Sequence, residues 1–127
     1  MKLASIDVGL KRIGIAICLT SDIVTPQMAI LRKNRDQAAS DVNAFLKEWE
    51  IEKLIVGFPS ASVDMQNRIK HFVGLLNLSI PYEFCEENMS SIEAEEMMKG
   101  EIKYKRDGRV DSLAAKIILE RFLAKKP

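Results

Sequence analysis

Residues 1–16 read Met1-Lys-Leu-Ala-Ser-Ile-Asp-Val-Gly-Leu-Lys-Arg-Ile-Gly-Ile-Ala16, and this stretch decides the fold. A first apolar run ends at Val8 and Gly9, and a second extends from Ile13 to Leu19. The connection between the two runs is short and polar. Two apolar, strand-like runs joined in this way predict a tight β-hairpin.

Asp7 is the unusual residue of this hairpin. Period-two alternation places it on one face with Leu3 and Ser5, near the end of a central strand. A charge in such a place is costly unless it is paired, hydrogen-bonded or bound to a metal. Two interpretations remain open at this point: Asp7 is satisfied by turn amides or by Arg12, or it is a functional ligand.

The composition is that of one globular domain spanning residues 1–127, with 47% apolar and 29% charged residues. The net charge of +1 produces no strong overall field, so any polyanion site must be a local patch. Cys18 and Cys85 lie in apolar runs without metal-ligand spacing, which predicts reduced core thiols. We see no signal peptide and no apolar run of spanning length, so we expect a cytoplasmic protein without membrane contact.

Basic residues gather in three places, each of which could also be an ordinary solvated surface. These are Arg32, Lys33 and Arg35; Lys99, Lys103, Lys105, Arg106 and Arg109; and Lys125 with Lys126.

The remaining chain predicts an α/β domain. A third strand at 23–31 contains Pro26, which favours a sheet edge. Apolar spacing then predicts helices at 36–49 and about 65–76, a capping box predicts one at 90–99, and strands are expected at 53–57 and 80–85. We therefore expect a mixed five-stranded sheet, three antiparallel strands followed by two parallel ones, with helices on both faces.

Acidic residues follow three of these elements. Asp7 ends the first strand, Glu86 and Glu87 follow the strand at 80–85, and Asp111 opens a last helix. Such acids would meet at the carboxyl edge of the sheet. Clusters of carboxylate oxygens suit Mg²⁺ or Mn²⁺, and a pair of such ions about 4 Å apart can clamp an in-line phosphoryl displacement.

Each acid also has a simpler explanation. Asp111 could be a helix N-cap, and Glu86 and Glu87 could complement the positive end of the 90–99 helix. His71 is expected on a helix surface, because no second His or Cys offers zinc spacing. We find neither a Ser-His-Asp or Cys-His arrangement nor a phosphate-binding loop motif.

Four ordered motifs resemble those of the YqgF (RuvX-like) family over nearly the whole chain. They are Asp7-Val-Gly-Leu-Lys-Arg-Ile-Gly-Ile-Ala16, Ile55-Val-Gly-Phe-Pro59, Glu86-Glu-Asn-Met-Ser-Ser91 with Glu93-Ala94, and Lys105-Arg106 with Val110-Asp111-Ser-Leu-Ala-Ala115 and Ile118-Leu119. The resemblance implies a ribonuclease-H-like fold and a bacterial nuclease assigned to processing of the 5′ end of the 16S ribosomal RNA precursor. Older assignments call the family a Holliday-junction resolvase.

The resemblance also implies functional residues. The acidic positions of the family correspond to Asp7, Glu87 and Asp111, which would be both metal ligands and catalytic residues. Glu87 is also favoured over Glu86 by alternation, which groups Glu86 with Tyr82 and Phe84. We assign substrate binding to five cations next to these acids: Lys11, Arg12, Lys105, Arg106 and Arg109.

Two positions depart from the family pattern. Asn88 stands where members usually carry an arginine that could meet phosphate. Asp64 is followed by Met65, whereas members tend to have Asp-Gly in this loop.

Three function classes follow. The first is a metal-dependent nuclease, acting on precursor ribosomal RNA or on branched DNA, as a monomer or homodimer. The second is a non-catalytic nucleic-acid-binding module, which intact Asp7, Glu87 and Asp111 disfavour. The third is an actin-like ATP-binding protein, which the chain length disfavours because those proteins need two such lobes.

Overall fold

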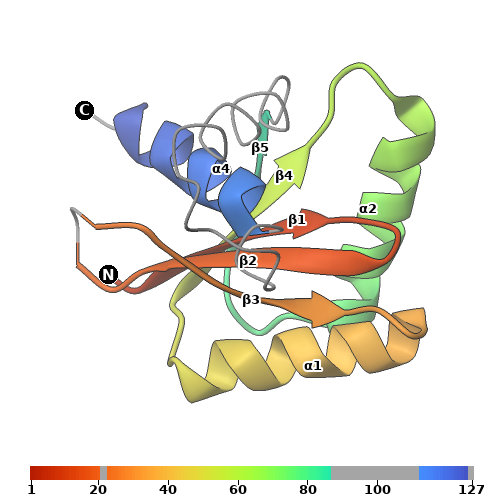
Figure 1. The fold of residues 1–127 in the computed structure, drawn as a ribbon, viewed down its shortest axis with the longest axis horizontal. Helices are drawn as coiled ribbons and strands as arrows, with labels where there is room; N and C mark the ends of the chain where they lie inside the picture. The colour runs from red at the N-terminus through yellow and green to blue at the C-terminus, as the bar shows by residue number, and fades with distance from the viewer. Residues whose placement is uncertain (21–22, 87–111, 126–127) are drawn as a thin grey trace, which may run out of the picture.

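A computed structural model describes residues 1–20, 23–86 and 112–125. Five strands form one sheet in the order β3-β2-β1-β4-β5, so β1 is the central strand (Figure 1). The strands are β1 Leu3–Val8, β2 Arg12–Cys18, β3 Thr25–Leu31, β4 Lys53–Phe58 and β5 Tyr82–Glu86. The helices are α1 Arg35–Glu48, α2 Val63–Leu76 and α4 Leu113–Ala124.

The opening hairpin is formed as predicted. β1 and β2 pair antiparallel from Leu3 opposite Cys18 to Val8 opposite Ile13. The turn is closed by a 3.0 Å hydrogen bond from the Gly9 N–H to the Arg12 carbonyl oxygen. A Cβ atom at Gly9 would lie 2.5 Å from that same oxygen, so the close approach of the turn requires glycine at this position.

Four strands point their carboxyl ends toward the same edge. β1 pairs parallel with β4, and β4 pairs parallel with β5. β2 runs the other way and pairs antiparallel with both β1 and β3, so β3 also points along β1. The predicted mixed sheet is therefore confirmed, and β3 is the edge strand that Pro26 favoured.

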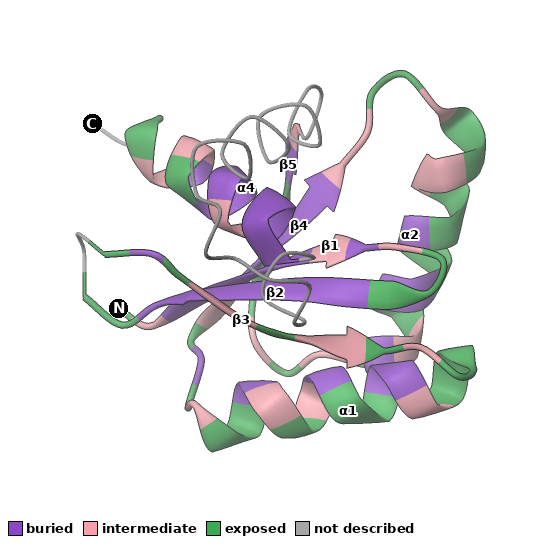
Figure 2. Cartoon of the chain, in the orientation of Figure 1, coloured by how far each residue is buried: buried purple, intermediate pink, exposed green. Residues whose placement is uncertain are grey.

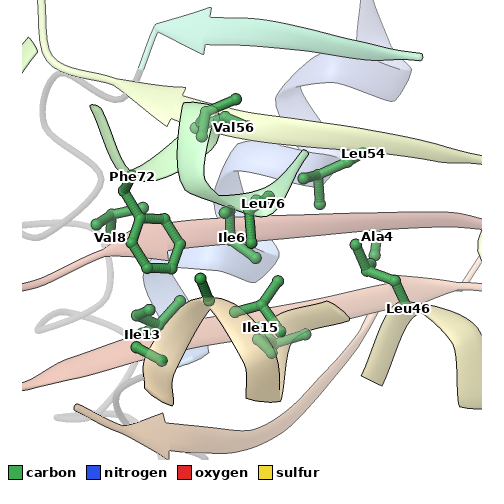
Figure 3. Packing of buried hydrophobic residues seen from close by; sticks show 14 of the residues in the cluster. Ala4, Ile6, Val8, Ile13, Ile15, Leu46, Leu54, Val56, Phe72 and Leu76 are labelled. Carbon is green, nitrogen blue, oxygen red and sulfur yellow. The ribbon is translucent and has the colours of Figure 1, made fainter. Parts of the chain in front are cut away.

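Helices α1 and α2 cover one face of the sheet (Figure 1). Their buried side chains pack on Ala4, Ile6 and Val8 of β1 and on the neighbouring strands, as Figure 3 shows around Phe72 and Leu46. Figure 2 shows the expected pattern along α1, with buried residues toward the sheet and exposed residues outside. Asn34 and Gln37 form a reciprocal capping box that begins this helix.

Helix α4 covers the opposite face. Its apolar residues pack with Leu3 and Ile55 of the central strands and with both cysteines, Cys18 and Cys85. Two buried serines add polar contacts here. The Ser5 hydroxyl donates a 2.6 Å hydrogen bond to the Ala115 carbonyl oxygen, and Ser112 begins the helix.

Some boundaries differ from the predicted ones. α2 begins at Val63 rather than about residue 65, because the Ser62 hydroxyl accepts a hydrogen bond from the Met65 N–H and caps the helix. β5 begins at Tyr82 rather than residue 80, directly after Pro81, whose carbonyl oxygen accepts from the Leu54 N–H. The helix predicted at 90–99 and the charged loop after it lie outside the described residues. No helix in the described ranges combines the length and apolar character needed to cross a membrane.

Candidate active site

Asp7 lies near the carboxyl end of the central strand, on the face that α4 covers. Its residue partner in β2 is Gly14, and one step beyond the last β1–β4 pair, Ile6 with Val56, it meets Gly57. Neither neighbour carries a side chain. The half-buried carboxylate therefore stands in its row of the sheet between two glycines.

Nothing in the described part of the chain forms a hydrogen bond or an ion pair with the Asp7 carboxylate. The turn amide of Gly9, which could have satisfied it, donates to the Arg12 carbonyl oxygen instead. The interpretation that turn amides neutralise Asp7 thus finds no support among these residues. A half-buried carboxylate without a partner is the kind of group that binds a cation.

Ser112 connects the start of α4 to the same region. It occupies the N-cap position, yet its side chain caps no helix amide. Its hydroxyl oxygen instead accepts a 3.0 Å hydrogen bond from the Ile15 N–H, where the β2–β3 register shifts. Ile15 follows Gly14, the partner of Asp7, so this bond holds the beginning of α4 beside the candidate site.

Asp111 itself lies outside the described residues. The predicted N-cap alternative can still be compared with α4, where the N-cap position is Ser112, one residue later. Consecutive Cα atoms are about 3.8 Å apart, so the anchored Ser112 limits how far residue 111 can be from the strand pair that carries Asp7.

Glu86 points to the other face of the sheet. Its carboxylate oxygen accepts a 3.3 Å hydrogen bond from the Ser60 N–H. Tyr82 and Phe84, which share its alternation, pack as aromatic rings, and Phe84 also lies 4.6 Å from the Phe58 ring. The expected grouping of Glu86 with the aromatic residues is confirmed.

The alternate residues of β5 face α4. Glu83 forms a 2.6 Å ion pair with Lys53, whose ammonium group lies 5.1 Å from the Phe122 ring of α4. Cys85 is buried in the α4 cluster. The face that Cys85 occupies is also the face of Asp7, and Glu86 is excluded from it.

The other predicted site residues divide into two groups. Lys11 and Arg12 lie in the exposed hairpin turn, two to three residues after the last strand pairs of β1 begin to end at Asp7. Glu87, Lys105, Arg106 and Arg109 lie, like Asp111, outside the described residues, and so does Asn88. Within the described ranges no three His, Cys, Asp or Glu side chains come together as a metal site.

The predicted roles of the cysteines and the histidine agree with the structure. Cys18 and Cys85 are free, buried thiols. Burial raises the pKa of the Cys85 thiol, and the opposing attraction of Lys125 and Arg121 is smaller. A protonated, buried thiol is neither a nucleophile nor a ready metal ligand. His71 is exposed on α2, as expected.

Sequence reasoning missed the residues that position the site. Gly14 and Gly57 leave space beside Asp7, and Ser112 anchors α4, yet none of the three carries chemistry of its own. Two signals were present in the sequence. Gly57 interrupts a buried strand, where glycine often marks a close approach, and Ser112 follows a candidate ligand directly.

The strand order and the two helical layers define a ribonuclease-H-like α/β fold of the resolvase class. The structure is similar to that of "T. thermophilus RuvC in complex with Holliday junction substrate", with a TM-score of 0.65 at 14% identity, covering 100% of this chain and 99% of that one. It is also similar to the Holliday junction resolvase of fowlpox virus, with a TM-score of 0.60 at 16% identity and 98% coverage of both chains. At these identities the likeness concerns the fold.

Residues 1–125 match the family described as "RuvX: Holliday junction resolvase", and the chain belongs to this family. Relatives named "Putative pre-16S rRNA nuclease" include one from Sulfurovum sp. (strain NBC37-1), 63% identical over 98% of this chain and 99% of its own length. Another, from Sulfurimonas denitrificans, is 51% identical over 99% of both chains. The resemblance drawn from the four motifs is thereby confirmed.

Proposed function

We propose that this protein is a metal-dependent endonuclease of the cytoplasm that hydrolyses phosphodiester bonds during 5′-end processing of the 16S ribosomal RNA precursor. The observation that carries the proposal is the Asp7 carboxylate, which has no partner in the described part of the chain and lies between two glycines at the carboxyl end of the central strand. The names of relatives that are up to 63% identical support the choice of substrate.

We propose Asp7, Glu87 and Asp111 as the metal ligands and catalytic residues. Alternation along β5 supports Glu87, because the residue after Glu86 in a continued strand would return to the face of Cys85 and Asp7. Gly57 pairs with Cys85, so such a residue would lie two strands and two residues from Asp7. This separation corresponds to about 12 Å between Cα atoms, which two acidic side chains and two ions about 4 Å apart can span.

The anchored start of α4 supports Asp111 as the third ligand. The Ser112 hydroxyl holds this point of the chain at Ile15, beside the strand pair of Asp7 and Gly14. The set of donors would then consist of carboxylate oxygens, which fit Mg²⁺ or Mn²⁺. Such ions, when bound, supply charge stabilisation and an activated water for phosphodiester hydrolysis.

The cations near the site have a separate role in this proposal. An acidic cluster repels a phosphodiester, so positive side chains must hold the substrate strand against it. Lys11 and Arg12 lie in the turn that follows Asp7, and Lys105, Arg106 and Arg109 precede Asp111 in the sequence. We assign substrate binding to these five residues.

Cleavage of branched DNA is the second candidate. The description of the family and the fold shared with two Holliday junction resolvases favour it. Both candidates use the same ligands, so the site itself does not separate them.

The test compares a precursor RNA that spans the 5′ end of 16S ribosomal RNA with a four-way DNA junction, each with Mg²⁺, Mn²⁺ or EDTA. The purified parent should cleave the RNA with either metal and not with EDTA, and Asp7→Asn should lose cleavage by orders of magnitude with unchanged or higher thermal stability, because repulsion among the carboxylates is removed. Equal cleavage by Asp7→Asn would end the proposed mechanism. Cleavage of the junction alone would favour the DNA substrate, and binding without cleavage would favour the non-catalytic module.

A further inference from the structure

A hollow of about 710 Å³ lies beside the hairpin turn, where three segments that are distant in the sequence come together. Figure 1 shows the β1–β2 turn, the start of α1 and helix α2 at this end of the molecule. We call this hollow the basic groove, because four cations line it: Arg32, Lys33, Arg35 and Arg68.

The basic groove has a marked excess of positive charge. Asp36 is the one carboxylate that lines it, so four cations and one anion give a local charge of +3 with His71 neutral. Among the described residues, none of the four cations forms a salt bridge. The N-terminus of α1 at Asn34 adds the positive end of a helix dipole. This concentration of unneutralised charge is unusual for a chain whose net charge is +1.

Arg32 holds the basic groove in shape. Its guanidinium donates a 3.0 Å hydrogen bond to the Gly9 carbonyl oxygen and lies 5.6 Å from the centre of the Phe72 ring of α2. Its backbone N–H donates a 2.8 Å hydrogen bond to the Lys11 carbonyl oxygen. One residue thus joins the hairpin turn, the β3–α1 connection and α2, so that the surrounding cations are presented on a rigid frame.

The basic groove begins close to Asp7. Leu10 lines it and is three residues after Asp7, so their Cα atoms are at most about 11 Å apart. Asp7 faces α4, whereas Arg32 packs on α2, on the other face of the sheet. A chain that left Asp7 would therefore cross the hairpin turn, with Lys11 and Arg12, before it entered the groove.

We infer that the basic groove binds the phosphate backbone of the nucleic-acid strand about three or more nucleotides away from the bond cleaved near Asp7. This inference rests on the proposed nuclease function and adds the path of the substrate to it. Spacing of about 3.4 Å per nucleotide along one strand sets the distance in nucleotides. The contacts are to phosphates, so they position the substrate and are the same for every sequence.

The experiment measures binding in the Asp7→Asn background, in which the substrate is not consumed. Lys33→Gln with Arg68→Gln removes two exposed cations of the groove and leaves the structural Arg32 in place. The matched control is Lys47→Gln with Lys125→Gln, which removes the same charge from exposed positions at the other ends of α1 and α4. The probe is a fluorescent single-stranded RNA, titrated over a range of KCl concentrations.

We expect the groove variant to lower the slope of log K against log salt by about 1.4 to 1.8, because each lost phosphate contact contributes about 0.7 to 0.9. At about 0.1 M salt this corresponds to roughly 25- to 60-fold weaker binding. The control should change the slope by much less. Equal slopes in the groove variant and the control would overturn the inference.

The outcome does not depend on catalysis. If the groove variant weakens binding as expected while the parent cleaves neither RNA nor DNA with a divalent metal, the proposed nuclease function fails and the groove stands. If the parent cleaves and the groove variant binds with the parental slope, the nuclease function stands and the groove is an ordinary solvated surface.

Discussion

Among the described residues, the face of the sheet under α1 and α2 is closed by apolar side chains alone, whereas the face under α4 also buries the hydroxyls of Ser5 and Ser112. The first face contains the larger cluster, with two helices packed on it. The second carries one helix, two polar contacts to the sheet and the unpartnered Asp7. Stability and function are thus assigned largely to opposite faces, and substitutions on each face should have different consequences.

The most damaging pair of substitutions tests this division directly. Ile69 of α2 and Ile118 of α4 are both fully buried, so replacing either with Ala should cost about 2–5 kcal/mol of unfolding free energy. Urea titration measures this loss. Cleavage per folded molecule should fall only for Ile118→Ala, because α4 holds the start of the proposed site. Equal losses of cleavage would show that the two faces do not have separate roles.

The two adjacent glutamates sharpen the comparison at the edge strand. Glu87→Gln should lower metal-dependent cleavage by at least about 100-fold, which is about 2.7 kcal/mol of transition-state stabilisation, because it removes a proposed ligand. Glu86→Gln should only weaken cleavage, since Glu86 bonds to the Ser60 N–H on the other face. Single-turnover rates at saturating Mg²⁺ measure both. The reverse ranking would show that the register beyond Cys85 is wrong.

The two buried serines form a matched pair. Ser112→Ala leaves the Ile15 N–H without its partner, and Ser5→Ala leaves the Ala115 carbonyl oxygen without one, so each should cost about 1–3 kcal/mol. Ser112→Ala should also lower the cleavage rate of the folded protein, because Ser112 positions the neighbouring Asp111. An equal effect of Ser5→Ala on cleavage would reduce Ser112 to a purely structural role.

The smallest effect concerns pH. Burial raises the pKa of the Cys85 thiol in the folded protein, so the folded state keeps its proton at pH values where the unfolded chain loses it. This contribution is fully present below the unfolded pKa, near 9, and is lost as the pH rises above it. Unfolding free energies at neutral pH and at about pH 10 should therefore differ more in the parent than in Cys85→Ala. A pH dependence unaffected by the substitution would contradict the assignment.

The fold could be predicted because each signal was local. Alternation fixed the faces of β1 and β5, Pro26 marked the edge strand, and apolar spacing located α1 to within one residue at each end. Asp7 was identified as a candidate because a charge in a central strand needs a reason. The role of Ser112 could not be predicted, because its bond to Ile15 joins residues 97 positions apart and depends on a register shift in β2.

The basic groove shows the same limit. Arg32, Lys33 and Arg35 formed a visible cluster in the sequence, which was compatible with a solvated surface. Arg68 belongs with them only because α2 packs next to the start of α1, and neither helix alone indicates that contact. Long-range packing therefore turned an ambiguous charge cluster into a defined surface.

The polar contacts of α4 have a consequence for synthesis of the protein on the ribosome. They join residues 97 and 110 positions apart, so the sheet and the α1–α2 layer can assemble before α4 exists. Residues 87–112 must still be added after β5, which takes about 1–5 s at about 5–20 residues per second. During that interval a growing chain carries Asp7 without the helix that completes its surroundings. Catalytic competence is thereby delayed until the chain has nearly left the ribosome.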